Sequence, residues 1–254
     1  MRRHGLWILA VSAATPFLLP GQTVREQPPL YQGPQTQVQG VFVTPIAGAP
    51  FTATVVVKNE QPAADGSTTT QHTLIMIARD AAGRIRNERH MMVPESFAGT
   101  PPLIFVHTFD PATRISHVYN PATMIDRQQA VPPLRAGDEQ KPPPGEDLGY
   151  TTLNGMQAKG TRVTRAVPAE ASPTGKPEKI VDEIWYSEDL HMNLLERHTD
   201  VRNGVQTVAI LSIQRDEPPA SLFEMPAGYK IVDMTPPPEP PAAQGGALAN
   251  DPTR

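Results

Sequence analysis

The stretch from Ile180 to Val232 sets the architecture of this chain, and it reads IVDEIWYSEDLHMNLLERHTDVRNGVQTVAILSIQRDEPPASLFEMPAGYKIV. This stretch predicts two β-strands joined at Ser187-Glu188-Asp189 and a third strand after Arg202-Asn203-Gly204. A short turn at residues 220–223 follows the third strand. We therefore expect a sheet core with a lid at its end.

The rest of the chain continues the pattern of short strands and turns. Asp110-Pro111-Ala112-Thr113 and Asn120-Pro121-Ala122-Thr123 form a small repeat that suits turns, and Asn154-Gly155 is a strong hairpin signal. No amphipathic helix is predicted beyond short pieces, so the fold is expected to be mostly β. Further strands are predicted at 38–46 (a first edge strand), 51–58, 68–78, 84–93 (charged on both faces and partly exposed), 103–109, 115–120, 124–128, 148–153 and 156–167.

The N-terminus has the form of a secretory signal. Arg2 and Arg3 precede an apolar run from Leu6 to Leu19, which is too short to span a bilayer comfortably. We expect cleavage between about residues 14 and 23 and a periplasmic or secreted protein, and an uncleaved anchor is the alternative. No later segment has the length and apolar character of a membrane span.

Proline marks the irregular parts of the chain, with 30 of 254 residues against an average share of about 5%. After the signal segment at 1–22, these prolines predict a flexible lead-in at 23–35, one β domain at 36–233 with a proline-rich loop at 129–147, and a disordered tail at 234–254.

Composition and motifs exclude several functions. The chain has no cysteine, and its formal charge of −4 becomes −6 without Arg2 and Arg3, so disulfides, thiol chemistry and nucleic-acid partners are not expected. It lacks a nucleophile elbow, a phosphate-binding loop, a dinucleotide fingerprint and a zinc-binding His pair. We predict no enzyme, no cofactor and no metal.

Several polar groups are candidate sites with a simpler structural interpretation. If Phe109 lies opposite Ile115, His107 faces His117, and the pair binds a metal, senses pH or is a hydrogen-bonded pair at the margin of the core. The repeats Glu88-Arg89-His90 and Glu196-Arg197-His198 are interpreted as exposed strands. The carboxylates Asp182, Glu183, Glu188 and Asp189 are explained by a solvated strand end, and the methionines at 91, 92, 156, 192 and 225 by the core.

Four motifs carry a resemblance to known proteins, namely residues 77–84 (IARDAAGR), 109–111 (FDP), 183–187 (EIWYS) and 222–229 (LFEMPAGY). They look like a group of uncharacterised exported proteins of acidobacterial type. More remotely, the chain is similar to the lipoprotein-carrier superfamily of LolA, LolB and the N-terminal domain of the sigma-E regulator RseB. The resemblance implies a curved antiparallel sheet, an unclosed half-barrel with an apolar concave face.

The strand at 205–214 is apolar on both faces in its middle, so its second face needs a lid, a partner or a ligand. One ring of the Trp185-Tyr186 pair is expected in the core and the other under the closing segment. We predict an exported, non-enzymatic binding protein that holds a lipid, an acyl chain or a lipoprotein segment in a cavity. An envelope regulatory or structural protein acting through protein contacts is the alternative. The predicted ligand-binding residues are Phe105, Trp185, Tyr186, Val208, Ile210, Leu211, Leu222, Phe223 and Tyr229.

Overall fold

The computed structural model describes residues 37–38, 41–63, 65–132, 145–172 and 174–236. The predicted signal segment and lead-in, most of the proline-rich loop and nearly all of the tail lie outside these residues. Residues 129–130 and 146–147, which we assigned to the loop, belong to strands.

The described residues form fifteen strands and two short 3₁₀ helices, η1 and η2, and contain no α-helix. The prediction of a mostly β fold is therefore confirmed for this part of the chain. The elements are β1 (Gln37–Val38), β2 (Val41–Phe42), β3 (Phe51–Pro62), β4 (Thr68–Arg79), β5 (Ile85–His90), β6 (Val93–Pro94), β7 (Leu103–Asp110), β8 (Ile115–Asn120), β9 (Ile125–Ala130), β10 (Glu146–Leu153), β11 (Met156–Val167), η1 (Ala169–Ala171), β12 (Glu178–Ser187), β13 (Met192–Asp200), β14 (Gly204–Gln214), η2 (Ala220–Phe223) and β15 (Lys230–Asp233).

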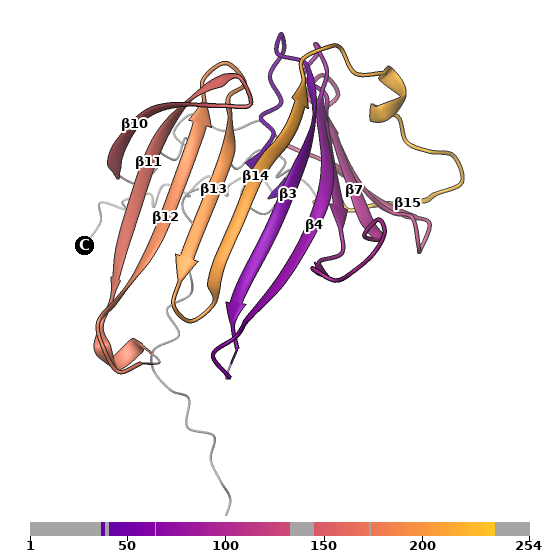
Figure 1. The fold of residues 1–254 in the computed structure, drawn as a ribbon. Helices are drawn as coiled ribbons and strands as arrows, with labels where there is room; N and C mark the ends of the chain where they lie inside the picture. Colours follow the sequence, from indigo (N-terminus) through magenta and orange to yellow (C-terminus); the bar gives the residue numbers. More distant parts are fainter. Residues whose placement is uncertain (1–36, 39–40, 64, 133–144, 173, 237–254) are drawn as a thin grey trace, which may run out of the picture.

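Thirteen of these strands form one curved sheet (Figure 1). Its order is β10-β11-β12-β13-β14-β3-β4-β5-β7-β8-β9-β15, with β6 paired to β4 off this path. Neighbours are antiparallel except β15, which runs parallel to β9. The order does not return from β15 to β10, so the sheet is open, as predicted.

The two repeated turns form as the sequence predicts. Asp110 and Asn120 each accept, through a side-chain oxygen, a hydrogen bond of 2.8 Å from the backbone N–H two residues further on. The loops end at Arg114 and Met124, with positive φ values of 58° and 53°. The same turn chemistry therefore joins β7 to β8 and β8 to β9.

The Asn154-Gly155 hairpin is also confirmed, with φ values of 50° and 76° that suit a type I′ turn. The side-chain amide of Asn154 donates a 2.8 Å hydrogen bond to the backbone oxygen of Ile210 in β14. The tip of the β10–β11 hairpin is thus fixed to a strand three places further along the sheet.

The central strands have a buried face and a more open face, which we call the inner face and the outer face. Along β3, the side chains of Phe51, Ala53, Val55 and Val57 are 0–3% exposed on the inner face, whereas the alternating residues are half-buried. The inner core also takes side chains from β4, β5, β13 and β14, together with Val43 from the segment before β3.

Three expectations are wrong in this part of the fold. The first edge strand does not join the main sheet, because β1 and β2 pair only with each other. Strand β5 is charged on only one of its faces at its start, since it lies between β4 and β7 and buries Ile85 and Asn87, although Arg89 is exposed. Met156 and Met192 are buried in the core as expected, but Met91 is 48% exposed. Strand β15 was not predicted.

Candidate functional site

The nine predicted ligand-binding residues do not share one pocket. Val208 and Ile210 are buried in the inner core. Leu211 is 57% exposed, because a bulge between Ile210 and Ser212 makes it an extra residue that has no partner in β3. Half-buried Trp185 and Tyr186 lie on β12, half-buried Phe105 on β7, and Leu222, Phe223 and Tyr229 follow β14.

A pocket of about 470 Å³ occurs at the β10 edge, and none of the nine residues lines it. Its walls are Gly145, Glu146, Arg162, Val163 and Thr164. The apolar cavity that we expected between β14 and the closing segment is not formed by the described residues, because Val208 and Ile210 are covered by other core side chains.

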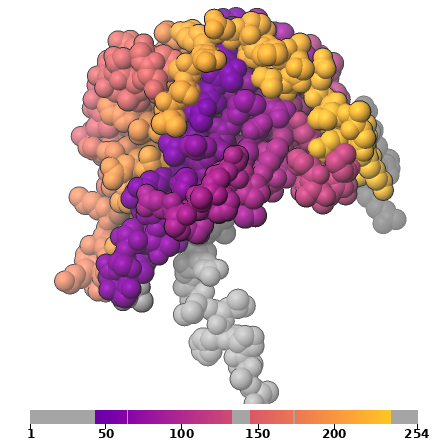
Figure 2. Space-filling view, turned by 45° about the vertical axis from the view of Figure 1, so that its right-hand side comes forward, coloured from indigo at the N-terminus to yellow at the C-terminus, as the bar shows by residue number. Residues whose placement is uncertain are grey.

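The closing segment, which we define as residues 215–233, packs on the outer face of β5 and β8 rather than on β14. Figure 2 shows this segment in yellow, running along the magenta part of the surface. The Arg84 guanidinium lies 5.1 Å from the centre of the Phe223 ring, and the rings of Tyr119 and Tyr229 meet edge to face at 5.2 Å. No hydrogen bond or ring contact among the described residues joins Trp185 or Tyr186 to this segment, and β12 is separated from β5 by four strands in the sheet.

A polar network lies beside the closing segment. Arg86 donates hydrogen bonds to the Tyr119 hydroxyl (2.6 Å), to the backbone oxygen of Leu222 (3.1 Å) and to Glu88 (2.9 Å). The other Glu88 oxygen lies 3.0 Å from His90. The side chains of Arg86, Glu88 and His90 are only 12–15% exposed, so Glu88 and His90 of the first Glu-Arg-His repeat are not exposed, and Glu88 supports the arginine that bonds the closing segment.

The outer face carries an uninterrupted apolar row across five strands. Direct cross-strand pairing places its residues side by side, and four strand spacings make the row about 19 Å long. Its members are half-buried except the last, which is 42% exposed. We call this the outer apolar row: Trp185, Leu195, Ala209, Val56 and Leu74.

A row of mixed charge borders it on the same face, formed by Arg162, Glu183, Arg197, Thr207, Lys58 and His72. Arg162 donates 2.6 Å and 2.9 Å hydrogen bonds to Glu183 and one of 3.1 Å to Glu146. Glu183 is therefore held within the sheet rather than at a solvated strand end. An apolar strip with a rim of mixed charge is typical of a protein contact surface.

Trp185 ends this row, and its ring lies on Gly160 of β11. A Cβ atom added to Gly160 would lie 2.6–2.8 Å from three ring carbons of Trp185. The indole is also packed against the margin of the core, so it is neither fully buried nor free in solvent.

This contact predicts strong coupling between the two positions. We expect Gly160→Ala to destabilise the protein by about 1–3 kcal/mol, because the ring must move. In a Trp185→Ala background the cost of Gly160→Ala should fall below about 0.5 kcal/mol. Urea denaturation of the wild type, the two single variants and the double variant would measure this difference. Equal costs in both backgrounds would contradict the contact.

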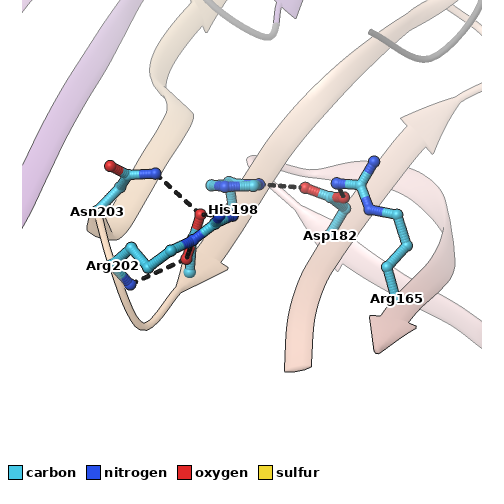
Figure 3. A network of polar contacts seen from close by, with 6 residues as sticks. Arg165, Asp182, His198, Arg202 and Asn203 are labelled. Carbon is cyan, nitrogen blue, oxygen red and sulfur yellow. Dashed lines mark hydrogen bonds and ion pairs between the residues drawn. The ribbon is translucent and has the colours of Figure 1, made fainter. Parts of the chain in front are cut away.

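On the inner face, a polar row lies beside the apolar core. Asp182, His198, Gln206, Asn59 and Gln71 are direct cross-strand neighbours on β12, β13, β14, β3 and β4. Asp182 accepts a 2.6 Å hydrogen bond from Arg165 and is 2.5 Å from Nδ1 of His198 (Figure 3). Gln206 donates a 2.9 Å bond to Asn59.

Asp200 belongs to the turn beside this row and has a structural role. Its buried carboxylate accepts hydrogen bonds from the backbone and side chain of Arg202 and from the side-chain amide of Asn203, at 2.9–3.1 Å (Figure 3). These bonds fix the β13–β14 turn, and Asp182 and His198 are the titratable pair of the inner row.

Glu196 is the most perturbed carboxyl group of this region. It lies on the inner face directly between Ile184 and Val208, with Asp182 diagonally across and His198 two residues along its own strand. Burial, then the charge of Asp182, raises the pKa of Glu196 to about 7, although His198 and Asn193 act in the opposite direction. The second Glu-Arg-His repeat is thus not an exposed strand.

The raised pKa of Glu196 predicts that stability falls as pH rises. The folded state holds the proton up to about pH 7, whereas the unfolded chain releases it near 4.5, so the protonated carboxyl stabilises the fold below this window. From pH 5 to pH 8 the wild type should lose about 2 kcal/mol relative to Glu196→Gln. His107 has a lowered pKa, so its contribution to stability changes with pH in the opposite direction. This contribution is the same in both proteins and cancels when their unfolding free energies are compared at each pH. If the unfolding free energies of the two proteins changed with pH in parallel, the prediction would be wrong.

The two histidines of the β7–β8 hairpin do not face each other. Asp110, not Phe109, lies opposite Ile115, so His107 pairs with Val118 on the inner face and His117 with Thr108 on the outer face. His117 contacts Asp126 at 2.7 Å, and His107 contacts Ser116 at 2.8 Å. Because the two imidazoles lie on opposite faces of the sheet, they are not placed to share a metal ion or a hydrogen bond.

Within the described ranges, no group of three or more His, Asp or Glu side chains is placed to hold a metal ion. None of the helices in the same ranges is long and apolar enough to cross a membrane.

Comparisons with known proteins give remote structural likenesses. No family model matches the chain, and no curated protein matches it. An uncharacterised conserved protein from Thermus thermophilus is 13% identical, with a TM-score of 0.40 over 73% of this chain and 90% of that one. The MucA/MucB complex of Pseudomonas aeruginosa is 13% identical in sequence, with a TM-score of 0.32 over 72% of this chain and 58% of that one. A putative outer membrane lipoprotein-sorting protein domain from Vibrio parahaemolyticus is 7% identical in sequence, with a TM-score of 0.25 over 65% of this chain and 85% of that one. We draw no functional conclusion from likenesses this remote.

Proposed function

We propose that this chain is a non-enzymatic binding protein of the cell envelope, which acts by docking a partner protein on the outer apolar row. The observation that supports it most is the row itself, in which five apolar side chains from five adjacent strands lie side by side, half-buried or exposed. A one-layer sheet normally presents polar side chains to solvent on its open face, so an apolar strip there favours a contact. The Trp185 end of the row already packs against core side chains, and the open part is formed by the other four residues.

The chemistry of the surroundings favours a protein over a lipid. Arg162, Glu183 and Arg197 border the row with both signs of charge, which suits the polar rim of a protein interface. Arg162 and Glu183 compensate each other, but an acyl chain that covered the rim would still remove Arg197 and this ion pair from water without offering a polar partner. On the inner face, Val208 and Ile210 are already covered by core residues, which leaves the apolar-ligand interpretation without its expected cavity.

Site-specific crosslinking tests this proposal. A benzophenone amino acid would replace Leu195 at the centre of the row, and the matched control would carry it at Gln157, an exposed strand residue outside the row. Both proteins would be irradiated in envelope preparations of the source cell, and the adducts identified by mass spectrometry. We expect one protein of defined mass at position 195, absent from position 157 and depleted by Leu74→Lys.

Three outcomes would overturn the proposal. Equal adducts at both positions would mean non-specific contact. An adduct with a second copy of the chain would make the row a contact between identical subunits. Phospholipid recovered from position 195 in place of protein would return the chain to the lipid-binding alternative.

A further inference from the structure

A second polar cluster lies on the inner face of β5, β7 and β8, on the side of the sheet opposite the outer apolar row. Asn87, 4% exposed, is directly opposite His107, which is 6% exposed. Nε2 of His107 lies 2.8 Å from the hydroxyl oxygen of Ser116 on β8. We call these three residues the Asn87 cluster.

The side-chain amide of Asn87 has no partner. Both Oδ1 and Nδ2 are buried, and neither makes a hydrogen bond. A buried amide that lacks its hydrogen bonds opposes folding, and such groups are rare in native structures unless they serve another purpose. The direct neighbours of Asn87 across the sheet are Ile77 on one side and His107 on the other. An apolar side chain would suit this position better if packing were its only role.

The cluster is electrically neutral. Burial, and next the charge of His117, lowers the pKa of His107 to about 4, so its ring is uncharged at neutral pH. The margins of the site are more open, since Phe105 and Val118 are half-buried, and Arg127, opposite Val118, is exposed. Arg89, also exposed, lies over the Phe105 ring at 5.7 Å, so the buried polar groups have half-buried apolar side chains and two exposed cations at their margins.

We propose that the Asn87 cluster is a binding site for a neutral carboxamide or peptide group. The Asn87 side chain offers one acceptor and one donor close together, and an amide presents the complementary donor and acceptor. A carboxylate has no hydrogen to donate, so it could accept from Nδ2 of Asn87 but would leave Oδ1 without a donor. A hydrocarbon would leave both atoms of Asn87 unsatisfied. The ligand class is therefore a small amide or an exposed peptide bond, with Phe105 and Val118 against its apolar part.

An NMR titration with N-methylacetamide tests the site. We expect the side-chain NH₂ signals of Asn87 and the ring signals of His107 to shift and saturate. Butan-2-one, which has the same shape without the N–H donor, should bind at least about fivefold more weakly, as the loss of one hydrogen bond implies. Acetate should bind more weakly still. Asn87→Leu should abolish the saturable shift of His107, whereas Asn59→Leu, whose amide already bonds Gln206, should leave it unchanged.

The same experiment can overturn the proposal. Equal binding of the amide and the ketone would mean an apolar pocket only. Shifts that do not saturate, or a bound water detected at Asn87 that the probe does not displace, would mean that the amide is satisfied without a ligand. If Asn87→Leu does not fold, Asn87→Thr replaces it, and retention of the saturable His107 shift in that variant would also contradict the site.

Discussion

Gly204→Ala is expected to destabilise the protein by about 3–5 kcal/mol, among the largest effects of a single methyl group. Gly204 has a φ of 81°, and a Cβ there would lie 1.9 Å from the backbone oxygen of Glu60 in β3. Left-handed backbone alone costs about 1–2 kcal/mol for a residue with a side chain. The remainder comes from separating β14 from β3 at the turn that Asp200 holds.

Gly66→Ala is the matched control for this variant. Gly66 has a φ of 82°, and a Cβ added there meets nothing within 4 Å. Its substitution should cost only the backbone contribution of about 1–2 kcal/mol. Chemical denaturation of both variants separates the cost of the left-handed backbone from the cost of the clash with Glu60. Equal losses of unfolding free energy would show that β14 and β3 move apart at this point without strain.

Phe51→Ala is expected to cost about 3–5 kcal/mol, as for other fully buried aromatic side chains. Phe51 is 0% exposed at the start of β3. The guanidinium of Arg79, also fully buried, lies 5.1 Å from the centre of its ring, so the substitution leaves both a cavity and a charge without its aromatic neighbour.

Phe97→Ala provides the comparison, because this ring is 41% exposed in a loop. Its loss should be below about 1 kcal/mol. Calorimetry or urea denaturation of the two variants would measure the difference. A loss below about 2 kcal/mol for Phe51→Ala would mean that the inner core collapses around the cavity more easily than its packing indicates.

Local structure could be predicted from the amino-acid sequence alone. The Asp-Pro and Asn-Pro turns and Asn154-Gly155 form where predicted, because their side chains and positive φ values are properties of a few consecutive residues. The strand content and the antiparallel pairing also follow from the alternation of apolar and polar residues, whereas the expectation of an open sheet came from the resemblance. Resemblance to exported proteins supplied the expectation of curvature.

The candidate sites, in contrast, depend on how distant strands pair. One residue of register in the β7–β8 hairpin put His107 and His117 on opposite faces, since side chains alternate along a strand. The bulge at Leu211 turned a predicted lining residue out to solvent. The outer apolar row requires β14 to pair with β3, where Ala209 lies opposite Val56, and nothing local in the sequence specifies that pairing. Turns are set by short-range interactions, whereas rows across a sheet depend on which distant strands meet and in which register.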